Sequence, residues 1–195
     1  MHISLDGFVA GPKGEMDWIK HDQEIFDFVG KRISTCETSL YGRVTFEMME
    51  NYWPTAAKKS SASKHDIEHS KWYKQVQKVV LSKSLDPNTY RETGLTKTKF
   101  ISGNLLDSIN EIKQSAPTSA DSGSEDILLF GSPTATHSLV QEHLIDGFWL
   151  FINPIILGRG IPLFVNVQDK INLKLLTTYQ FKSGVVELNY LVKSQ

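Results

Sequence analysis

The sequence predicts an α/β protein with one mixed, mostly parallel sheet, helices on both faces and an antiparallel hairpin near its C-terminal end. Apolar runs at 78–82 and 127–130, typical of strands buried on both faces, alternate with segments of helical periodicity. Two further strand-like runs, 173–179 and 185–191, flank Ser183-Gly184, which is typical of a hairpin turn. We expect the whole chain, 1–195, to form a single domain.

The N-terminal elements follow from local signals. A short strand with alternating Ile3 and Leu5 runs into a turn at Asp6-Gly7 and ends by Ala10. Asp22 is placed to cap a helix that extends through Ile33. A strand over 38–41 passes through Gly42 directly into a helix over 44–51, which we expect to stop before Pro54. Residues 55–71 are polar and predict a surface excursion, with one helical turn near 67–73.

The remaining elements continue the alternation of strand and helix. After the strand at 78–82 we expect a short strand at Phe100-Ile101 and a helix marked by Leu105, Ile109 and Ile112. Residues 115–126 are rich in Ser, Ala, Asp and Gly, which predicts a mobile loop. Then come the strand at 127–130, a helix carrying Leu139, Val140 and Leu144, a strand at 148–152, an irregular stretch over 154–164 and the hairpin.

Composition excludes several functional classes. Twenty-one basic against 22 acidic residues leave a net charge of −1, so nothing favours non-specific binding to nucleic acid. No apolar run is long enough for a membrane span, and the first residues do not have the pattern of a secretion signal. The single cysteine, Cys36, cannot form an intrachain disulfide. We therefore expect a soluble protein of the cytoplasm.

Two strand-to-helix junctions share one design, in which a strand ends in glycine and a helix begins at once. They are Ser39-Leu40-Tyr41-Gly42-Arg43-Val44-Thr45 and Leu128-Leu129-Phe130-Gly131-Ser132-Pro133-Thr134-Ala135-Thr136. The missing side chain allows close approach, and the free N–H groups and dipole of a helix start attract an anion. In an open α/β sheet such junctions lie at the same edge, so together they predict a pyrophosphate site. The alternative is that Gly and Ser are ordinary helix-cap residues.

A third strand end, Leu81-Ser82-Lys83, adds a hydroxyl and a cation, and Arg43 adds a second cation. A 2′-phosphate on an adenosine ribose needs such partners, which favours NADP(H) over NAD(H). The alternative is that Arg43 and Lys83 are solvated surface charges. Neither junction has the spacing of a Rossmann fingerprint, and the sequence contains no Walker A motif.

Several motifs taken together resemble the dihydrofolate reductase-like superfamily, and within it the reductase domain at the C-terminus of the bifunctional riboflavin-biosynthesis deaminase/reductase. The resemblance runs nearly end to end. It rests on Ser4-Leu5-Asp6-Gly7-Phe8-Val9-Ala10, Gly14-Glu15-Met16-Asp17-Trp18, Leu40-Tyr41-Gly42-Arg43-Val44-Thr45-Phe46, Val80-Leu81-Ser82, Leu128-Leu129-Phe130-Gly131-Ser132, Leu144-Ile145-Asp146 and the stretch 153–164. The short first strand leads us to expect that the family's usual start lies upstream of Met1.

The resemblance implies a three-layer α/β/α fold, NADPH as hydride donor and a homodimer. It places the residues 6–18 over the nicotinamide, with Asp6, Asp17 and Trp18 as the catalytic candidates. The cofactor-binding residues that it implies are Gly42, Arg43, Val44, Thr45, Leu81, Ser82, Lys83, Gly131, Ser132, Pro133, Thr134 and Ala135. The implied reaction is reduction of 5-amino-6-(5-phosphoribosylamino)uracil or of another pyrimidine-like or pterin-like ring.

Two departures from the family pattern leave the substrate open. The stretch Glu50-Asn51-Tyr52-Trp53-Pro54 lacks the acidic pair and Arg that bind the ribose phosphate, and Phe130 stands where the riboflavin reductase has Glu. The alternatives are a dihydrofolate reductase-like enzyme, or a dinucleotide- or phosphate-binding module of the same fold without catalysis.

One further pattern imitates a metal site. His65 and His69 have the spacing of a zincin helix, but the intervening acid is Asp66 and no third ligand follows, so we predict no metal.

Overall fold

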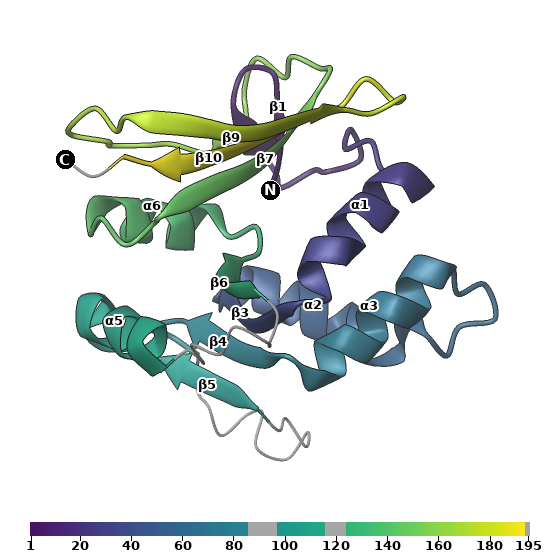
Figure 1. Cartoon of the computed structure of the whole chain (residues 1–195), viewed down its shortest axis with the longest axis horizontal. Helices are drawn as coiled ribbons and strands as arrows, with labels where there is room; N and C mark the ends of the chain where they lie inside the picture. Colours follow the sequence, from purple (N-terminus) through teal and green to yellow (C-terminus); the bar gives the residue numbers. More distant parts are fainter. Residues whose placement is uncertain (86–96, 116–123, 194–195) are drawn as a thin grey trace. The chain divides into compact units, whose positions relative to one another are not determined.

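The computed structural model describes residues 1–85, 97–115 and 124–193 and confirms a mixed α/β fold with parallel strands and a C-terminal antiparallel hairpin (Figure 1). The chain divides into two compact units. The first contains residues 1–25 and 133–195, and the second contains residues 26–132. None of the helices in these described ranges is long and apolar enough to cross a membrane.

The first unit is built on a four-stranded sheet in the order β1-β7-β10-β9. Its strands are β1 (His2–Ser4), β7 (Gly147–Asn153), β10 (Val186–Val192) and β9 (Leu173–Gln180). β1 runs parallel to β7, whereas β10 runs antiparallel to both of its neighbours. The short strands β2 (Phe8–Ala10) and β8 (Ile161–Pro162) form a separate antiparallel pair. The first strand predicted from Met1 to Ala10 is thus two strands.

One face of this sheet carries the apolar core of the unit. Phe148 and Leu150 point to that face from β7, and they pack with Ile3 and with Val140 of α6 (Pro133–Gln141). Figure 1 shows α6 lying along this sheet. The helix ends at Gln141, so Leu144, which we placed in it, lies beyond its last turn.

The second unit contains an all-parallel sheet in the order β5-β4-β3-β6. Its strands are β3 (Cys36–Gly42), β4 (Gln77–Leu81), β5 (Thr98–Ile101) and β6 (Ser124–Leu129). The helices are α2 (Arg43–Ala56), α3 (Lys64–Gln75) and α5 (Leu105–Ser115), and α1 (Gln23–Ile33) begins at the end of the first unit's N-terminal segment. The Asp22 carboxylate accepts from the N–H of Ile25 at 2.9 Å, which confirms the predicted cap of α1.

An aromatic core fixes α2 and α3 on the parallel sheet. Tyr41, Phe46, Tyr73 and Val80 are each at most 1% exposed and form one cluster. The rings of Tyr41 and Phe130 stack with centroids 5.5 Å apart. This packing therefore holds the C-terminal ends of β3 and β4 in a fixed position relative to the start of α2.

Three further predictions about elements were wrong. The helix after Gly42 does not stop before Pro54 but continues to Ala56. Proline removes a single hydrogen bond near the end of a helix, and the fully buried Ala56 and the packing of Trp53 hold the last turn. The polar excursion contains the 12-residue helix α3, because Ser63 and Asp66 form a reciprocal capping box. Finally, the irregular stretch 154–164 contains β8.

The single sheet that we predicted is divided by its hydrogen bonds into two four-stranded sheets and the β2-β8 pair. β1 has only three residues and pairs with β7 at one edge of the first sheet. β6 is the strand at one edge of the parallel sheet. The loop predicted over 115–126 lies mainly outside the described residues, but Ser124–Leu129 already forms β6.

Candidate functional site

The glycine turns of the two predicted junctions meet in the second unit. β3 and β6 are parallel neighbours, and the N–H of Phe130 donates to the carbonyl of Leu40 at 3.0 Å. At the C-terminal ends of these strands the N–H of Gly42 donates to Ser132 Oγ at 2.8 Å. A Cβ placed on Gly131 would lie 3.5 Å from the methyl group of Thr45. The sequence prediction that the two junctions share one edge is therefore confirmed.

The second junction has an unusual backbone. Gly131 and Ser132 both adopt left-handed conformations, with φ of +53° and +56°. Such a conformation costs a non-glycine residue about 1 kcal/mol or more and is common at ligand clamps. Ser132 is held there because its hydroxyl donates to the carbonyl of Phe130 while it accepts from Gly42. The buried Ser132 thus joins the two turns.

The start of α2 suits an anion. Its N-cap is Gly42, which has no side chain to accept from the first N–H groups of the helix. Val44 is 61% exposed in the first turn. Arg43, the predicted cation, forms an ion pair with Glu47 one turn along the same helix, with Nη1 and Oε2 2.9 Å apart. Uncapped N–H groups at a helix start bind phosphate oxygens.

The end of β4 lies beside this helix start, since Leu81 is the register partner of Gly42. Ser82 Oγ accepts from the N–H groups of Ser84 and Leu85 at 3.2 and 3.0 Å, which shapes the turn after the strand. Lys83 follows as an exposed cation. The predicted set of Leu81, Ser82 and Lys83 therefore adjoins the first junction.

Pro133, Thr134 and Ala135 form the first turn of α6 and belong to the first unit. The next residue, Thr136, is 2% exposed, and no hydrogen-bond partner of its hydroxyl exists among the described residues. The site set predicted from sequence stops at Ala135 and omits Thr136. The only sequence signal for Thr136 was its position in a run of hydroxyl residues at the start of the helix.

Asp6 holds two turns of the first unit together. Its carboxylate accepts from the Ser4 hydroxyl at 2.6 Å and from the N–H groups of Leu157 and Gly158 at 3.1 and 2.8 Å. The hydrogen bond from Ser4, followed by those from the backbone, lowers the pKa of Asp6 below its ordinary value. A carboxylate that is held ionised in this way is suited to positioning a loop and is a poor proton donor.

Asp17 and Trp18 lie in a series of turns before α1. Asp17 is exposed, and the indole of Trp18 donates to the carbonyl of Glu15 at 3.0 Å. The segment is anchored after Trp18, where the N–H of Lys20 donates to Asn153 Oδ1 at 2.9 Å. Asn153 is fully buried and also donates to the carbonyls of Ile3 and Phe151. Sequence reasoning missed this anchor, because an Asn at the end of a strand has many ordinary uses.

The two departures from the family pattern have packing roles. Glu50 accepts from the Tyr73 hydroxyl at 2.9 Å, and Trp53 donates through its indole N–H to Met49 Sδ. Phe130 packs against Tyr41 and Trp72 in the aromatic core. These side chains make their contacts within the second unit.

His65 and His69 are part of the same aromatic packing. His65 stacks on Phe26 with ring centroids 4.0 Å apart, and His69 lies 4.0 Å from Trp53. Burial lowers the pKa of His69 to about 3. Across the described ranges, no group of three or more His, Cys, Asp or Glu side chains is arranged to hold a metal ion.

Comparisons with known proteins agree with this architecture. Residues 1–187 match the model of the RibD C-terminal domain. The uncharacterized protein YyaP of Bacillus subtilis is 33% identical over 192 residues, which cover 96% of this chain and 90% of that protein.

Solved structures show the same fold. A protein from Shewanella sp. PV-4 that is described as a riboflavin biosynthesis protein superposes with a TM-score of 0.71 at 18% identity, over 100% of this chain and 97% of that one. The dihydrofolate reductase of Enterococcus faecalis, solved with NADP(H), gives a TM-score of 0.56 at 13% identity, over 99% and 94% of the two chains. The fold is therefore dihydrofolate reductase-like, and the family match points to an oxidoreductase of the reductase type. On the match over residues 1–187 and the 33% identity to YyaP, this chain belongs to the RibD C-terminal domain family.

Proposed function

We propose that the protein is an NADPH-dependent reductase that transfers a hydride to a C=N or C=O group of a pyrimidine-like or pterin-like ring. The observation that carries the proposal is the joined pair of turns in the second unit. There an uncapped helix start and two left-handed residues, Gly131 and Ser132, lie next to Thr45. Family membership supports the same function.

The residues at these turns fit a dinucleotide. Gly42 to Thr45 and Gly131 to Ala135 would hold the pyrophosphate through backbone N–H groups and hydroxyls. Leu81, Ser82 and Lys83 would hold the adenosine end, with Arg43 as a second cation for a 2′-phosphate. NADPH would supply the hydride, and the substrate's proton would come from another group.

For the first unit we propose that the segment with Asp17 and Trp18 covers the nicotinamide and excludes water during transfer. Asp6 would act as a positioning residue for the turn that precedes that segment, since its carboxylate joins the turns at Ser4 and Gly158. A homodimer in the cytoplasm, where NADPH is abundant, completes the proposal and is supported by the family resemblance.

The test is titration of the purified protein with NADPH and, separately, NADH, followed by quenching of tryptophan fluorescence. We expect saturable binding that prefers NADPH. Gly131→Ala should weaken binding at least about 10-fold, because a Cβ at a left-handed turn blocks the approach of a phosphate to the backbone. Gly30→Ala is the matched control, since Gly30 lies within α1 with nothing within 4 Å of an added Cβ. Failure of folded protein to bind either nucleotide would overturn the cofactor assignment.

Turnover then separates the candidate functions. We expect NADPH oxidation, seen as loss of absorbance, with 5-amino-6-(5-phosphoribosylamino)uracil or a related ring. Oxidation that depends on dihydrofolate would instead establish the dihydrofolate reductase alternative. Tight NADPH binding without turnover on any ring would favour a binding module without catalysis. The packing of Glu50 and Phe130 within the second unit is consistent with that alternative.

A further inference from the structure

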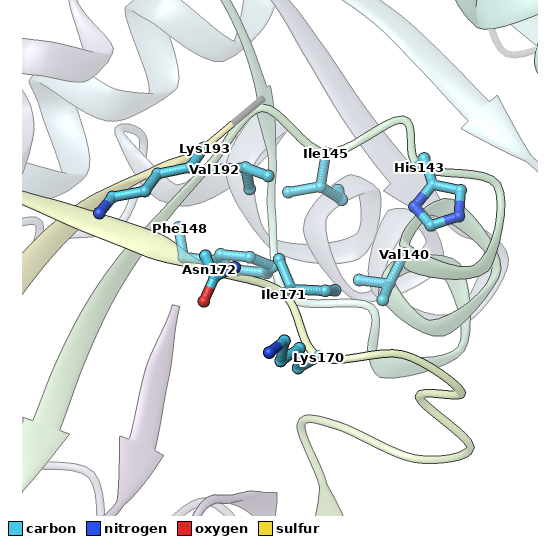
Figure 2. Close-up of a pocket in the computed structure, with 9 residues that line it drawn as sticks. All are labelled: Val140, His143, Ile145, Phe148, Lys170, Ile171, Asn172, Val192 and Lys193. Carbon is cyan, nitrogen blue, oxygen red and sulfur yellow. The ribbon is translucent and has the colours of Figure 1, made fainter. Parts of the chain in front are cut away.

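The first unit contains a cavity of about 330 Å³ that the proposed reductase function does not use. Figure 2 shows the side chains around it. Val140, Ile145, Phe148, Ile171 and Val192 give it an apolar interior that continues into the core of the unit. His143, Lys170, Asn172 and Lys193 complete the lining. We call this cavity the α6 pocket.

The α6 pocket is formed by three chain segments that backbone hydrogen bonds tie together. The N–H of Val192 donates to the carbonyl of Asp146, and that of Lys193 donates to the carbonyl of Asn172, both at 2.8 Å. The walls are therefore fixed by the sheet and do not depend on side-chain packing alone. Small-molecule sites are commonly preformed, mostly apolar and about 300–1,000 Å³ in volume.

The charged side chains that line the α6 pocket have one sign. Of the lining residues, three are basic and none carries a carboxylate. Lys170, Lys193 and His143 are all exposed, and the lysines carry their charges on long flexible stems that can turn toward a ligand. An apolar interior with a basic rim is complementary to a molecule with an apolar body and an anionic head.

His143 lies beside the pocket in a left-handed conformation. His143 follows α6 with φ of +54°. Its N–H donates to the carbonyl of Val140 and the N–H of Leu144 donates to that of Leu139, so His143 occupies the left-handed position that closes a helix and that Gly usually fills. The left-handed position at the end of α6 therefore places a histidine side chain, instead of glycine, beside the pocket.

We propose that the α6 pocket binds a small amphiphilic anion, a carboxylate on a short apolar chain or a single ring. The carboxylate would lie among Lys170, Lys193 and His143, and the apolar part would contact Phe148, Ile171 and their apolar neighbours. All of these residues belong to the first unit, so binding requires neither NADPH nor turnover.

The experiment is calorimetric titration of the nucleotide-free protein with 4-phenylbutyrate and with the uncharged 4-phenyl-1-butanol. We expect one saturable site for the acid and binding of the alcohol that is weaker by about 5-fold, the range of exposed ion pairs. The double variant Lys170→Gln/Lys193→Gln should lose this difference. Lys182→Gln, at the far end of the β9-β10 hairpin, removes an equivalent charge from the same unit and should not change binding. Absence of saturable binding, or equal affinity for acid and alcohol, would overturn the proposal.

His143→Gly separates a binding role from a structural one. Because Gly relieves the left-handed strain, we expect the Tm without ligand to rise by about 2–4 °C while affinity for 4-phenylbutyrate falls. Ile171→Trp, which places a larger side chain in the apolar interior of the pocket, should abolish binding in protein that circular dichroism shows to be folded. Unchanged affinity in both variants would place the ligand elsewhere and overturn the assignment.

Discussion

Single polar residues fix the loops on which the proposed site depends. Ser132 joins the two glycine turns of the second unit, and Asn153 anchors the segment that follows Trp18 in the first. Asp6 does the same between its own turn and the Leu157-Gly158 turn. These residues act on the proposed chemistry by holding backbone in place.

The pH dependence of stability should expose the role of Asp6. Its pKa in the folded protein is lowered from 3.8, so its contribution is fully present above about pH 5 and is lost as the pH falls through the folded pKa. We therefore expect Asp6→Asn to be less stable than the wild type at pH 7, with the difference shrinking below about pH 4. Urea unfolding at pH 7, 5 and 3 measures this, with Asp17→Asn as the exposed control. An equal difference at pH 7 and 3 would contradict the assignment.

Among single residues, part of the candidate site could be predicted from the sequence. The two glycine junctions were predictable, because strand, glycine and helix signals occur in immediate succession. The backbone partners of Asp6 were not, since they lie 151 and 152 residues away. The orphan hydroxyl of Thr136 was equally hidden, because burial of a helical Thr depends on which face packs against the sheet.

Among the elements, α3 shows how a local signal can be overlooked in a polar segment. Ser63 and Asp66 form a capping box in which Ser63 Oγ accepts from the Asp66 N–H at 3.1 Å and Asp66 accepts from the Ser63 N–H at 2.9 Å. The lysine-rich composition suggested a loop. The cap, together with the buried His69, Ser70 and Tyr73 on one face, makes a helix.

Removal of this cap should have a measurable cost. We expect Ser63→Ala to reduce the free energy of unfolding by about 1 kcal/mol, the usual contribution of an N-cap, and the Tm by about 2–4 °C. Ser61→Ala, an exposed residue two positions earlier, is the matched control and should change neither. Differential scanning calorimetry measures both variants. A loss no larger than that of Ser61→Ala would show that tertiary packing alone holds the start of α3.

Element type was predictable where apolar periodicity is strong, as in β4, α5 and the β9-β10 hairpin. Boundaries failed where tertiary contacts decide. Pro54 stays within α2 because of packing on the aromatic core, and the division into separate sheets depends on which strands pair. Neither can be read from a local window of sequence.

In the whole molecule, the two proposed binding sites are made of different residues. The joined glycine turns belong to the second unit, and the α6 pocket belongs to the first. A ligand that binds only the folded state raises the free energy of unfolding by about 2.7 kcal/mol at 100 times its Kd. Thermal shifts can therefore report the two sites in one experiment.

We expect a crossed pattern of loss. At 100 times the wild-type Kd, Gly131→Ala should lose about half or more of the stabilisation by NADPH and keep that by 4-phenylbutyrate, because it changes a turn that has no residue in the pocket. Lys170→Gln/Lys193→Gln should show a smaller stabilisation by 4-phenylbutyrate, in line with its about 5-fold weaker binding, and keep that by NADPH. Differential scanning calorimetry of wild type and both variants, with each ligand at the same multiple of its wild-type Kd, measures all six shifts. A reduced response to both ligands in one variant would mean that the two proposed sites are coupled, which contradicts their assignment to independent sets of residues.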